Sequence, residues 1–237
     1  MEANEKYSRQ ALLKEIGEKQ EFLSASTLAV IGLGALGTHC SELLARAGVE
    51  NLILIDEDVI EESNLQRQSL YEEKDVGKSK VKVAKYKLEK INSRTKIITH
   101  EVFLDKDNTS ILDTADLILD CTDNLETRFV INKYCKEKNK VWIFSSAVKT
   151  SGYCMAIFPE GPCLECFLEN TELDSSCTLG VINTIINSIS SLAATLAIKI
   201  LTKQECPREL YHYNIWKPEL KKLVVRKKKV CKACGKE

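Results

Sequence analysis

The stretch Thr27–Gly37, TLAVIGLGALG, decides the fold of this chain. Its first five residues are apolar or β-branched, so they predict a short buried strand. The glycines that follow predict a tight turn, and residues 35–47 have a pattern compatible with a helix. A strand, a glycine-rich turn and a helix in this order are typical of the first unit of a nucleotide-binding α/β sheet.

A second apolar run, Asn51–Ile55, predicts the next buried strand, and it ends at Asp56. Because Asp56 lies 19 positions after Gly37, it is placed to accept hydrogen bonds from ribose hydroxyl groups. Within the turn, Gly32 permits the bend, Gly34 lets backbone N–H groups approach a phosphate, and Gly37 allows close packing of helix and strand. On these features NAD and ATP fit equally well, and a loop that only connects two elements is the alternative.

The composition describes a chain with ample core and no excess charge. Of its 237 residues 44% are hydrophobic, and 34 basic and 34 acidic residues cancel, so there is no bulk attraction for nucleic acid or an anionic membrane. The basic run 226–229 is expected to be a solvated segment. No apolar run approaches the roughly 20 residues of a spanning helix, and the N-terminus lacks the apolar block of a signal peptide. We expect a cytoplasmic protein.

Two C-x-x-C pairs, Cys163/Cys166 and Cys231/Cys234, are the strongest single motif, with Cys166 and Cys231 lying 65 positions apart. Four thiolates in this arrangement predict a tetrahedral zinc site that ties the C-terminus to the middle of the chain. A closed shell of four sulfur atoms leaves no position for water, so the zinc would be structural. A thioredoxin-type redox pair is disfavoured because neither pair is expected to open a helix after a strand.

The remaining pattern alternates between strands and helices and then changes after Ala147. Helices are predicted over 78–91, 125–138 and 181–201, and residues 1–20 are charged and helix-like. Strands are predicted over 95–99, 116–120, 141–145 and 152–159, with a cysteine-bearing loop over 161–176 and an antiparallel pair over 211–216 and 222–225. The predicted fold is α/β: a Rossmann-like, mostly parallel sheet with helices on both faces, continued by antiparallel strands and a zinc knuckle.

A dense group of polar side chains follows the acidic residue at 56, within the segment 56–80. Its members are Asn64, Arg67, Gln68 and Lys80. A hydride-transfer enzyme has no need for them beside the ribose site. Nucleotidyl transfer does need them, because its transition state spreads negative charge over the α-phosphate and the leaving pyrophosphate. The group therefore favours ATP over NAD, with a solvated loop as the alternative.

Taken in order, the motifs resemble the ThiF/MoeB/HesA family, bacterial relatives of the ubiquitin-activating enzymes, and the layout is closest to MoeB and ThiF. The motifs are GLGALG at 32–37, SNLQRQ at 63–68, VGKSKV at 76–81, DCTDN at 120–124 and the two cysteine pairs. YSRQ at 7–10 is similar to the family's N-terminal motif. The resemblance runs along nearly the whole chain.

Such proteins use ATP to adenylylate the C-terminal glycine carboxylate of a small ubiquitin-like sulfur carrier of the ThiS or MoaD type, which ends in Gly-Gly. Pyrophosphate leaves, and the carrier is prepared for thiocarboxylation in thiamine or molybdopterin biosynthesis. The resemblance implies that Gly34 and its neighbours contact the nucleotide and that Asp56 contacts the ribose. It assigns the phosphates to Asn64, Arg67 and Lys80, with Gln68 beside them.

The DCTDN motif is implied to supply a magnesium ligand. Asp123 is the expected ligand, because Mg²⁺ prefers carboxylate and phosphate oxygens and the residue follows a predicted strand. Asp120 is the alternative ligand or a structural cap. We expect Arg128 to pair with Glu126 or with a neighbouring helix.

Three further expectations come from the resemblance. Arg9 is implied to reach into the active site of a partner subunit, which predicts a homodimer. Cys177 lies where relatives carry a loop cysteine, and it is either a plain cysteine or one that forms a thioester or persulfide. Only three residues follow Cys234, so we expect no sulfurtransferase domain and a separate sulfur donor such as a cysteine desulfurase.

We therefore expect a single domain, 1–237, with a nucleotide-binding half at 27–147 and a carrier-binding and zinc half at 148–237. The cofactors would be ATP, Mg²⁺ and Zn²⁺, without a nucleic-acid or membrane partner. The same fold could instead adenylate a peptide C-terminus or a tRNA-bound carboxylate. A dinucleotide-dependent oxidoreductase and a non-catalytic zinc-stapled binding module are the alternatives of other classes.

Overall fold

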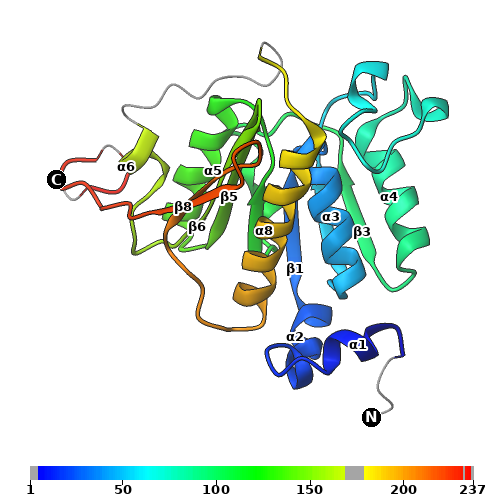
Figure 1. Cartoon of the computed structure of the whole chain (residues 1–237), viewed down its shortest axis with the longest axis horizontal. Coiled ribbons are helices and arrows are strands. Elements are labelled where there is room, and N and C mark those ends of the chain that lie inside the picture. The colour runs from blue at the N-terminus through cyan, green and yellow to red at the C-terminus, as the bar shows by residue number, and fades with distance from the viewer. Residues whose placement is uncertain (1–4, 169–178, 232, 236–237) are drawn as a thin grey trace.

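The computed structural model describes residues 5–168, 179–231 and 233–235 (Figure 1). Within these ranges eight strands form one sheet in the order β3-β2-β1-β4-β5-β6-β7-β8. The strands are β1 (Thr27–Ile31), β2 (Asn51–Ile55), β3 (Lys96–His100), β4 (Leu117–Asp120), β5 (Trp142–Val148), β6 (Ser151–Ile157), β7 (Leu210–Asn214) and β8 (Glu219–Leu223). The sheet therefore runs without a break through both halves of the chain.

The first five strands are parallel and the last three are antiparallel to their neighbours. Parallel strands are buried on both faces, which explains the nearly continuous apolar runs TLAVI and NLILI. The pairing is in register, with Val30 opposite Leu54 on one side and Leu119 on the other. The predicted mostly parallel sheet with an antiparallel extension is confirmed.

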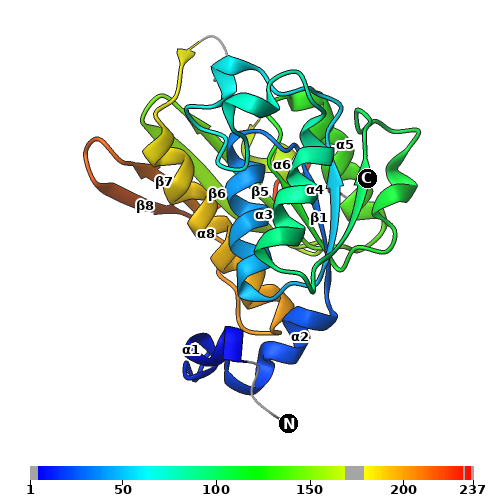
Figure 2. The ribbon, with the colours of Figure 1, turned by 90° about the vertical axis from the view of Figure 1, so that its right-hand side faces the viewer.

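Helices cover both faces of the sheet, as predicted (Figures 1 and 2). The helices are α1 (Ser8–Ala11), α2 (Gln20–Ala25), α3 (Ala35–Ala47), α4 (Lys80–Ile91), α5 (Leu125–Glu137), α6 (Leu164–Leu168) and α8 (Asn183–Leu201). The apolar side chains of α3, α4 and α8 form one core with Leu28 and Val30 of β1. Those of α5 and α6 form a second core with Ala29 and Ile31, so successive residues of β1 serve opposite layers.

Helix α8 is long and apolar enough to cross a membrane by length and composition, contrary to the expectation that no such run exists. Half of its apolar window is buried, and it packs against α3 and the strands β5 and β6. Ile185 and Ile189, for example, are fully buried in the core. A core helix of a folded domain passes the same composition test, and the packing identifies α8 as such a helix.

Several short elements differ from the sequence predictions. Residues 5–20 do not form one helix: they form short 3-10 and α-helical turns that are interrupted over 12–16, and the next turn begins at Gly17, whose φ is +29°. The predicted loop 161–176 contains α6, whose first backbone N–H, at Leu164, is capped by the side chain of Asn132 on α5 (3.0 Å). Strand β8 begins at Glu219 rather than 222, because Glu219 pairs with Asn214.

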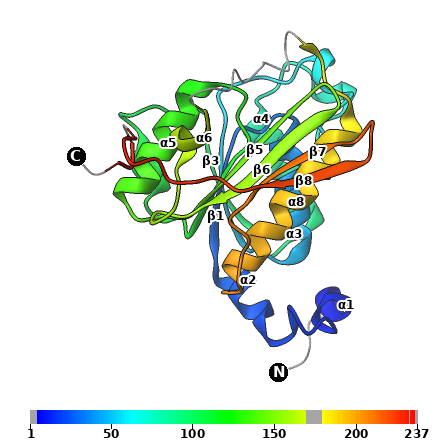
Figure 3. The ribbon, with the colours of Figure 1, turned by 60° about the vertical axis from the view of Figure 1, so that its left-hand side comes forward.

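The two ends of the sheet are occupied differently (Figure 3). Helices α1 and α2 lie where β1 begins, at the amino end of the parallel strands (Figures 1 and 3). Gln10 of α1 donates to the carbonyl of Ala47, the last residue of α3 (2.7 Å). Helix α3 starts at the glycine turn after β1 and runs back to Ala47, so the carboxyl end of β1 lies beside the start of α3, at the end of the sheet opposite α1 and α2.

Candidate active site

A cavity of about 450 Å³ lies at the carboxyl ends of β1, β2 and β4. Strand β1 has β2 on one side and β4 on the other, so the order in which strands are added to the sheet reverses at this point. Open α/β sheets bind ligands at such switch points. The predicted residues that line the cavity are Gly32, Gly34, Asp56, Asn64, Arg67, Gln68, Lys80 and Asp123. The fold thus brings together residues separated by up to 91 positions, 32 to 123.

The glycines of the turn differ in what requires them. Gly32 has a φ of +86°, and a Cβ there would lie 2.9 Å from the carbonyl oxygen of Cys121. A Cβ at Gly37 would lie 1.8 Å from the carbonyl oxygen of Gly32, so the helix can approach the turn only without a side chain. Gly34 is different: its φ is −79°, and a Cβ would meet only the side-chain nitrogen of Gln68 at 3.7 Å. The protein itself does not need Gly34, which leaves room in the cavity for a ligand.

Asp56 is held in place by the backbone around it. Its Oδ2 accepts from the N–H of Leu33 (2.5 Å), and its Oδ1 accepts from the N–H of Asp58 (2.8 Å). Burial raises the pKa of this carboxyl, while Lys80 and the two N–H groups act in the opposite direction. The carboxylate is therefore fixed at the mouth of β2 with lone pairs left for further donors.

Lys80 is the first residue of α4, and only 6% of it is exposed. Its ammonium group pairs with the carboxylate of Asp58 at 2.7 Å, and its backbone N–H donates to the carbonyl of Asp58 (3.0 Å). Asp58 is 61% exposed at the side chain, so the pair stands at the cavity wall. Asp58 is not predicted from the sequence as a cavity residue, although its position two residues after Asp56, at the end of a predicted strand, places it near the site.

The polar segment after β2 supplies the remaining predicted side chains. Asn64 is buried, and its Oδ1 accepts from the N–H of Glu61 (3.2 Å), which stabilises the turn. Arg67 donates to the carbonyl of Ser63 (2.8 Å). Gln68 is 4% exposed, and its Oε1 has no hydrogen-bond partner among the residues that the structure describes. A buried polar atom without a partner is costly, so the amide of Gln68 is suited to bind a ligand in the cavity.

The loop after β4 carries Asp123 into the cavity. Asp123 is exposed, whereas Asp120 is fully buried and lies 3.2 Å from the guanidinium of Arg128. Arg128 therefore pairs with Asp120 and not with Glu126 or a neighbouring helix, which corrects the expectation. Burial raises the pKa of Asp120, and the charge of Arg128 opposes that rise.

Charges along the cavity wall favour a divalent cation with an anionic ligand. The carboxylates are Asp56, Glu57, Asp58, Glu61 and Asp123, and the cations are Arg67, Lys80 and Arg128. Five acidic groups against three basic ones would repel a bare triphosphate. Carboxylate oxygens are the ligands that Mg²⁺ takes in proteins, usually one or two of them together with substrate phosphates. The donor set of this cavity fits a bound magnesium–nucleotide.

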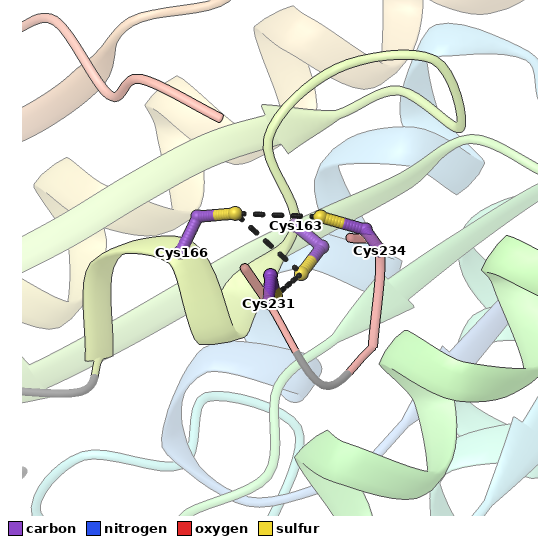
Figure 4. A group of neighbouring side chains, drawn as sticks. All are labelled: Cys163, Cys166, Cys231 and Cys234. Atoms are coloured by element: carbon purple, nitrogen blue, oxygen red, sulfur yellow. Dashed lines mark hydrogen bonds between the residues drawn. The ribbon is translucent and has the colours of Figure 1, made fainter. Parts of the chain in front are cut away.

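The four cysteines of the two C-x-x-C pairs come together between α6 and the C-terminal segment that carries Cys231 and Cys234 (Figure 4). Their sulfur atoms lie within 4.8 Å of one another, with 3.9 Å for Cys163–Cys166, 3.6 Å for Cys163–Cys231 and 3.4 Å for Cys166–Cys234. Four sulfurs bound to one zinc ion at about 2.3 Å lie roughly 3.8 Å apart, so the cluster fits Zn²⁺.

The electrostatics of the cluster are uneven. Burial raises the pKa of Cys163. Burial also acts to raise the pKa of Cys231, but hydrogen bonds from the backbone N–H groups of Cys234 and Ala233 and from the thiols of Cys163 and Cys234 together outweigh it and lower that pKa to about 7. Cys163 directly precedes α6, so the first pair does open a helix after strand β6, contrary to the expectation. The redox alternative is nevertheless disfavoured, because the sulfur atoms of both pairs lie close enough together to bind one shared metal ion.

Comparison with known proteins identifies the family. The ThiF family model matches residues 7–234. The chain belongs to the ThiF family. It is 34% identical over 239 residues to the sulfur carrier protein ThiS adenylyltransferase of Bacillus subtilis (strain 168), covering 97% of this chain and 71% of that protein. It is 36% identical over 242 residues to the Escherichia coli (strain K12) protein of the same name, covering 97% and 94%.

The fold agrees with this membership. A crystal structure of E. coli MccB with ATP superposes with a TM-score of 0.86 at 26% identity, over 98% of this chain and 75% of that one. The resemblance stated from the motifs is thus confirmed, and so is the enzyme class: this ThiF family member is an adenylyltransferase. The use of ATP follows from that class. The dinucleotide-dependent oxidoreductase and the non-catalytic binding module lose their support.

Of the predicted nucleotide-site residues of this ThiF family protein that the structure describes, Gly37 and Arg9 do not line the cavity. Arg9 is exposed on α1, at the amino end of the sheet, and does not line the cavity of its own chain. Cys177 lies outside the described residues. Sequence analysis also missed the wall formed by residues 102–104 after β3, because the apolar pattern of a loop carries no periodic signal.

Proposed function

We propose that the protein uses ATP to adenylylate the C-terminal glycine carboxylate of a small ubiquitin-like sulfur carrier that ends in Gly-Gly, releasing pyrophosphate. The observation that carries the proposal is the cavity itself, in which Arg67, Lys80 and Asp123 converge at the switch point of the sheet. The carrier is proposed as the acyl substrate because both adenylyltransferase relatives are named for a sulfur carrier protein, ThiS. The proposed products prepare the carrier for thiocarboxylation.

In the proposed reaction, the carrier carboxylate attacks the α-phosphorus of ATP and the bond to the β-phosphate oxygen breaks. The attacking carboxylate is already ionised near neutral pH, so no protein base is required. Arg67 and Lys80 stabilise the charge that develops on the phosphates, and Asp56 accepts from the ribose hydroxyls. Lys80 has to exchange its present partner, Asp58, for a phosphate oxygen.

Two metals complete the proposal. Asp123 would hold Mg²⁺, which neutralises phosphate charge when bound. The four cysteines would hold a structural Zn²⁺ that ties residues 231–235 to α6. Asn64 and Gln68 lie beside the phosphate region as further polar contacts, and Gly34 leaves room for the nucleotide.

The surroundings of the site suggest its partners. We propose that the protein is a cytoplasmic homodimer in which Arg9 serves the cavity of the other subunit, because Arg9 lies at the end of the sheet opposite its own cavity. The chain is proposed to work as a single domain whose residues 148–237 bind the carrier. A separate sulfur donor, such as a cysteine desulfurase, would complete the thiocarboxylation, with Cys177 as a candidate for a covalent step.

The test is ATP:pyrophosphate exchange stimulated by a Gly-Gly carrier. We expect Arg67→Ala and Asp123→Ala each to lower exchange at least about 10²-fold, while unfolding by urea stays near that of the wild type. Arg46→Ala and Asp107→Ala, at exposed positions outside the cavity, are the matched controls. A carrier lacking its last glycine should not stimulate exchange. Unimpaired exchange in both cavity variants would refute the proposal.

A further inference from the structure

The loop Asp120–Asn124, which carries Asp123, is fixed from below by a buried network. Asp120 ends β4 and is 0% exposed. Its Oδ1 accepts from the backbone N–H of Thr122 (3.0 Å) and from the Thr122 hydroxyl (2.7 Å). Its Oδ2 faces the Nε of Arg128 at 3.2 Å. The contact of Oδ2 with Nε is an ion pair without hydrogen-bond geometry, so the bonds from Thr122 to Oδ1 hold this carboxylate in place. Asp120 is not among the described residues that line the cavity, which favours Asp123 as the magnesium ligand.

The guanidinium of Arg128 contacts the end of β4, the loop that follows it and strand β5. It projects from α5 and is 3% exposed. Its Nη2 donates to the carbonyl of Thr122 (2.5 Å) and to the carbonyl of Ser145 on β5 (3.1 Å), and its guanidinium lies over the ring of Phe144 (5.0 Å). Thus one guanidinium contacts the end of β4, the middle of β5 and the middle of the loop.

The two ends of the loop are closed by separate bonds. The hydroxyl of Ser145 donates to the carbonyl of Asp120 (2.6 Å). At the other end, the side chain of Asn124 caps α5 by accepting from the N–H of Thr127 (2.8 Å). Asp123 is consequently the exposed carboxylate of a loop whose residues on either side are each anchored to the frame.

We propose that Arg128 is a positioning residue for the cation-binding carboxylate of Asp123, acting through the Asp120–Thr122 bonds. This inference rests on the proposed function, in which Asp123 holds Mg²⁺. A buried ion pair is weak evidence for stability, because desolvation of two charges offsets much of their attraction. Its use here is geometric: groups behind a metal ligand fix the orientation of that ligand, and their loss typically weakens metal binding by about 10–100-fold.

The experiment measures cation binding rather than turnover. Mn²⁺ is titrated into the full-length protein with a non-hydrolysable ATP analogue, and bound Mn²⁺ is quantified by electron paramagnetic resonance. Arg128→Lys keeps the charge but loses the planar group that reaches Asp120, Thr122 and Ser145 together. Thr122→Val removes only the hydroxyl bond to Asp120, and Thr122→Ser restores it.

We expect Arg128→Lys to weaken Mn²⁺ binding about tenfold and Thr122→Val to weaken it measurably, with Thr122→Ser near the wild type. Affinity for the analogue without a divalent cation should change less than about twofold in the Thr122 variants, which keep every charge of the cavity wall. Arg46→Lys, exposed on α3, and Thr202→Val, a buried threonine after α8 whose hydroxyl donates to Ile198, are the matched controls. If Arg128→Lys fails to fold, the Thr122 pair decides the question.

Asp123→Ala separates the two levels of the proposal. Loss of Mn²⁺ binding in Asp123→Ala, together with wild-type binding in Arg128→Lys and Thr122→Val, would overturn the positioning role and leave the proposed function standing. Retained Mn²⁺ binding in Asp123→Ala would instead overturn the magnesium assignment and the positioning role with it. A fall in thermal stability without any change in Mn²⁺ affinity would show that Arg128 is only structural.

Discussion

The cavity at the strand ends and the cysteine cluster behind α6 are both built from chain segments far apart in sequence, but they differ in what is left over. The four sulfurs of the cluster all lie within 4.8 Å of one another, and a single ion would satisfy all of them. In the cavity, by contrast, Gln68 has a buried oxygen with no hydrogen-bond partner within the described part of the chain, and Lys80 pairs with the exposed carboxylate of Asp58.

This difference separates stabilisation from chemistry. A closed ligand set has no open position and can only hold chain segments together. A site with provisional partners can exchange them for a substrate. None of the four cysteines lines the cavity, so changes in one region should leave the measured property of the other almost unchanged.

The first prediction concerns a variant that lacks one of the four sulfur ligands of the cysteine cluster. Cys234→Ser should abolish stoichiometric zinc and lower the free energy of unfolding by about 3 kcal/mol, because metal binding is coupled to the folding of its ligands. Nucleotide affinity of the folded protein should stay within about threefold of the wild type. Metal analysis, urea unfolding and nucleotide titration measure these quantities.

Cys206→Ser, at a buried cysteine outside the cluster, is the control for this prediction and should retain zinc. A variant that keeps its stability but loses nucleotide binding would contradict the separation, since the knuckle would then act on the cavity directly.

The second prediction changes the cavity without touching the fold. In Gly34→Ala the new Cβ meets no backbone atom within 4 Å, so unfolding free energy should stay within about 1 kcal/mol of the wild type. The same methyl group occupies space at the nucleotide turn, so we expect ATP affinity to fall about tenfold, equivalent to about 1.4 kcal/mol.

Gly161→Ala offers a matched comparison, because its Cβ would contact only the carbonyl oxygen of Phe158 at 3.5 Å, outside the cavity. It should bind ATP as the wild type does. Equal affinities for the Gly34 and Gly161 variants would show that the nucleotide does not approach the turn.

The same comparison explains what could be predicted from sequence. Strands at 27–31 and 51–55 and the helix at 35–47 were predicted at their observed bounds, because each has a local pattern and the glycine turn has a local steric cause. The cysteine cluster was predicted because four thiols have a single common use at that spacing. Local chemistry sufficed in both cases.

The parts that were missed depend on tertiary contacts. Helix α6 is short and takes its cap from Asn132, 32 positions away. Arg128 of α5 pairs with Asp120 at the end of the preceding strand, β4. Lys80 pairs with Asp58, which is 22 positions away. No periodicity announces such pairs, since they form only when the carboxyl ends of the parallel strands meet at one edge.

The smallest expected effect concerns the charge of Asp56. Burial raises the pKa of its carboxyl above the usual value of 3.8, against the opposing influence of Lys80 and of backbone N–H groups. Below 3.8 both the folded and the unfolded protein hold the proton, so nothing is lost there. Between 3.8 and the raised pKa the unfolded chain has released its proton while the folded state still holds it, so stability falls over that window and levels off above the raised pKa.

Asp56→Asn does not titrate, so its stability relative to the wild type should improve as the pH rises from about 4 and then level off. The constant offset from the lost N–H acceptor does not affect this slope. Urea unfolding of both proteins across that range measures it, with Asp107→Asn as an exposed control. A relative stability that falls with rising pH would mean that Lys80 and the backbone outweigh burial, and that the cavity is built to favour the ionised carboxylate before any ribose arrives.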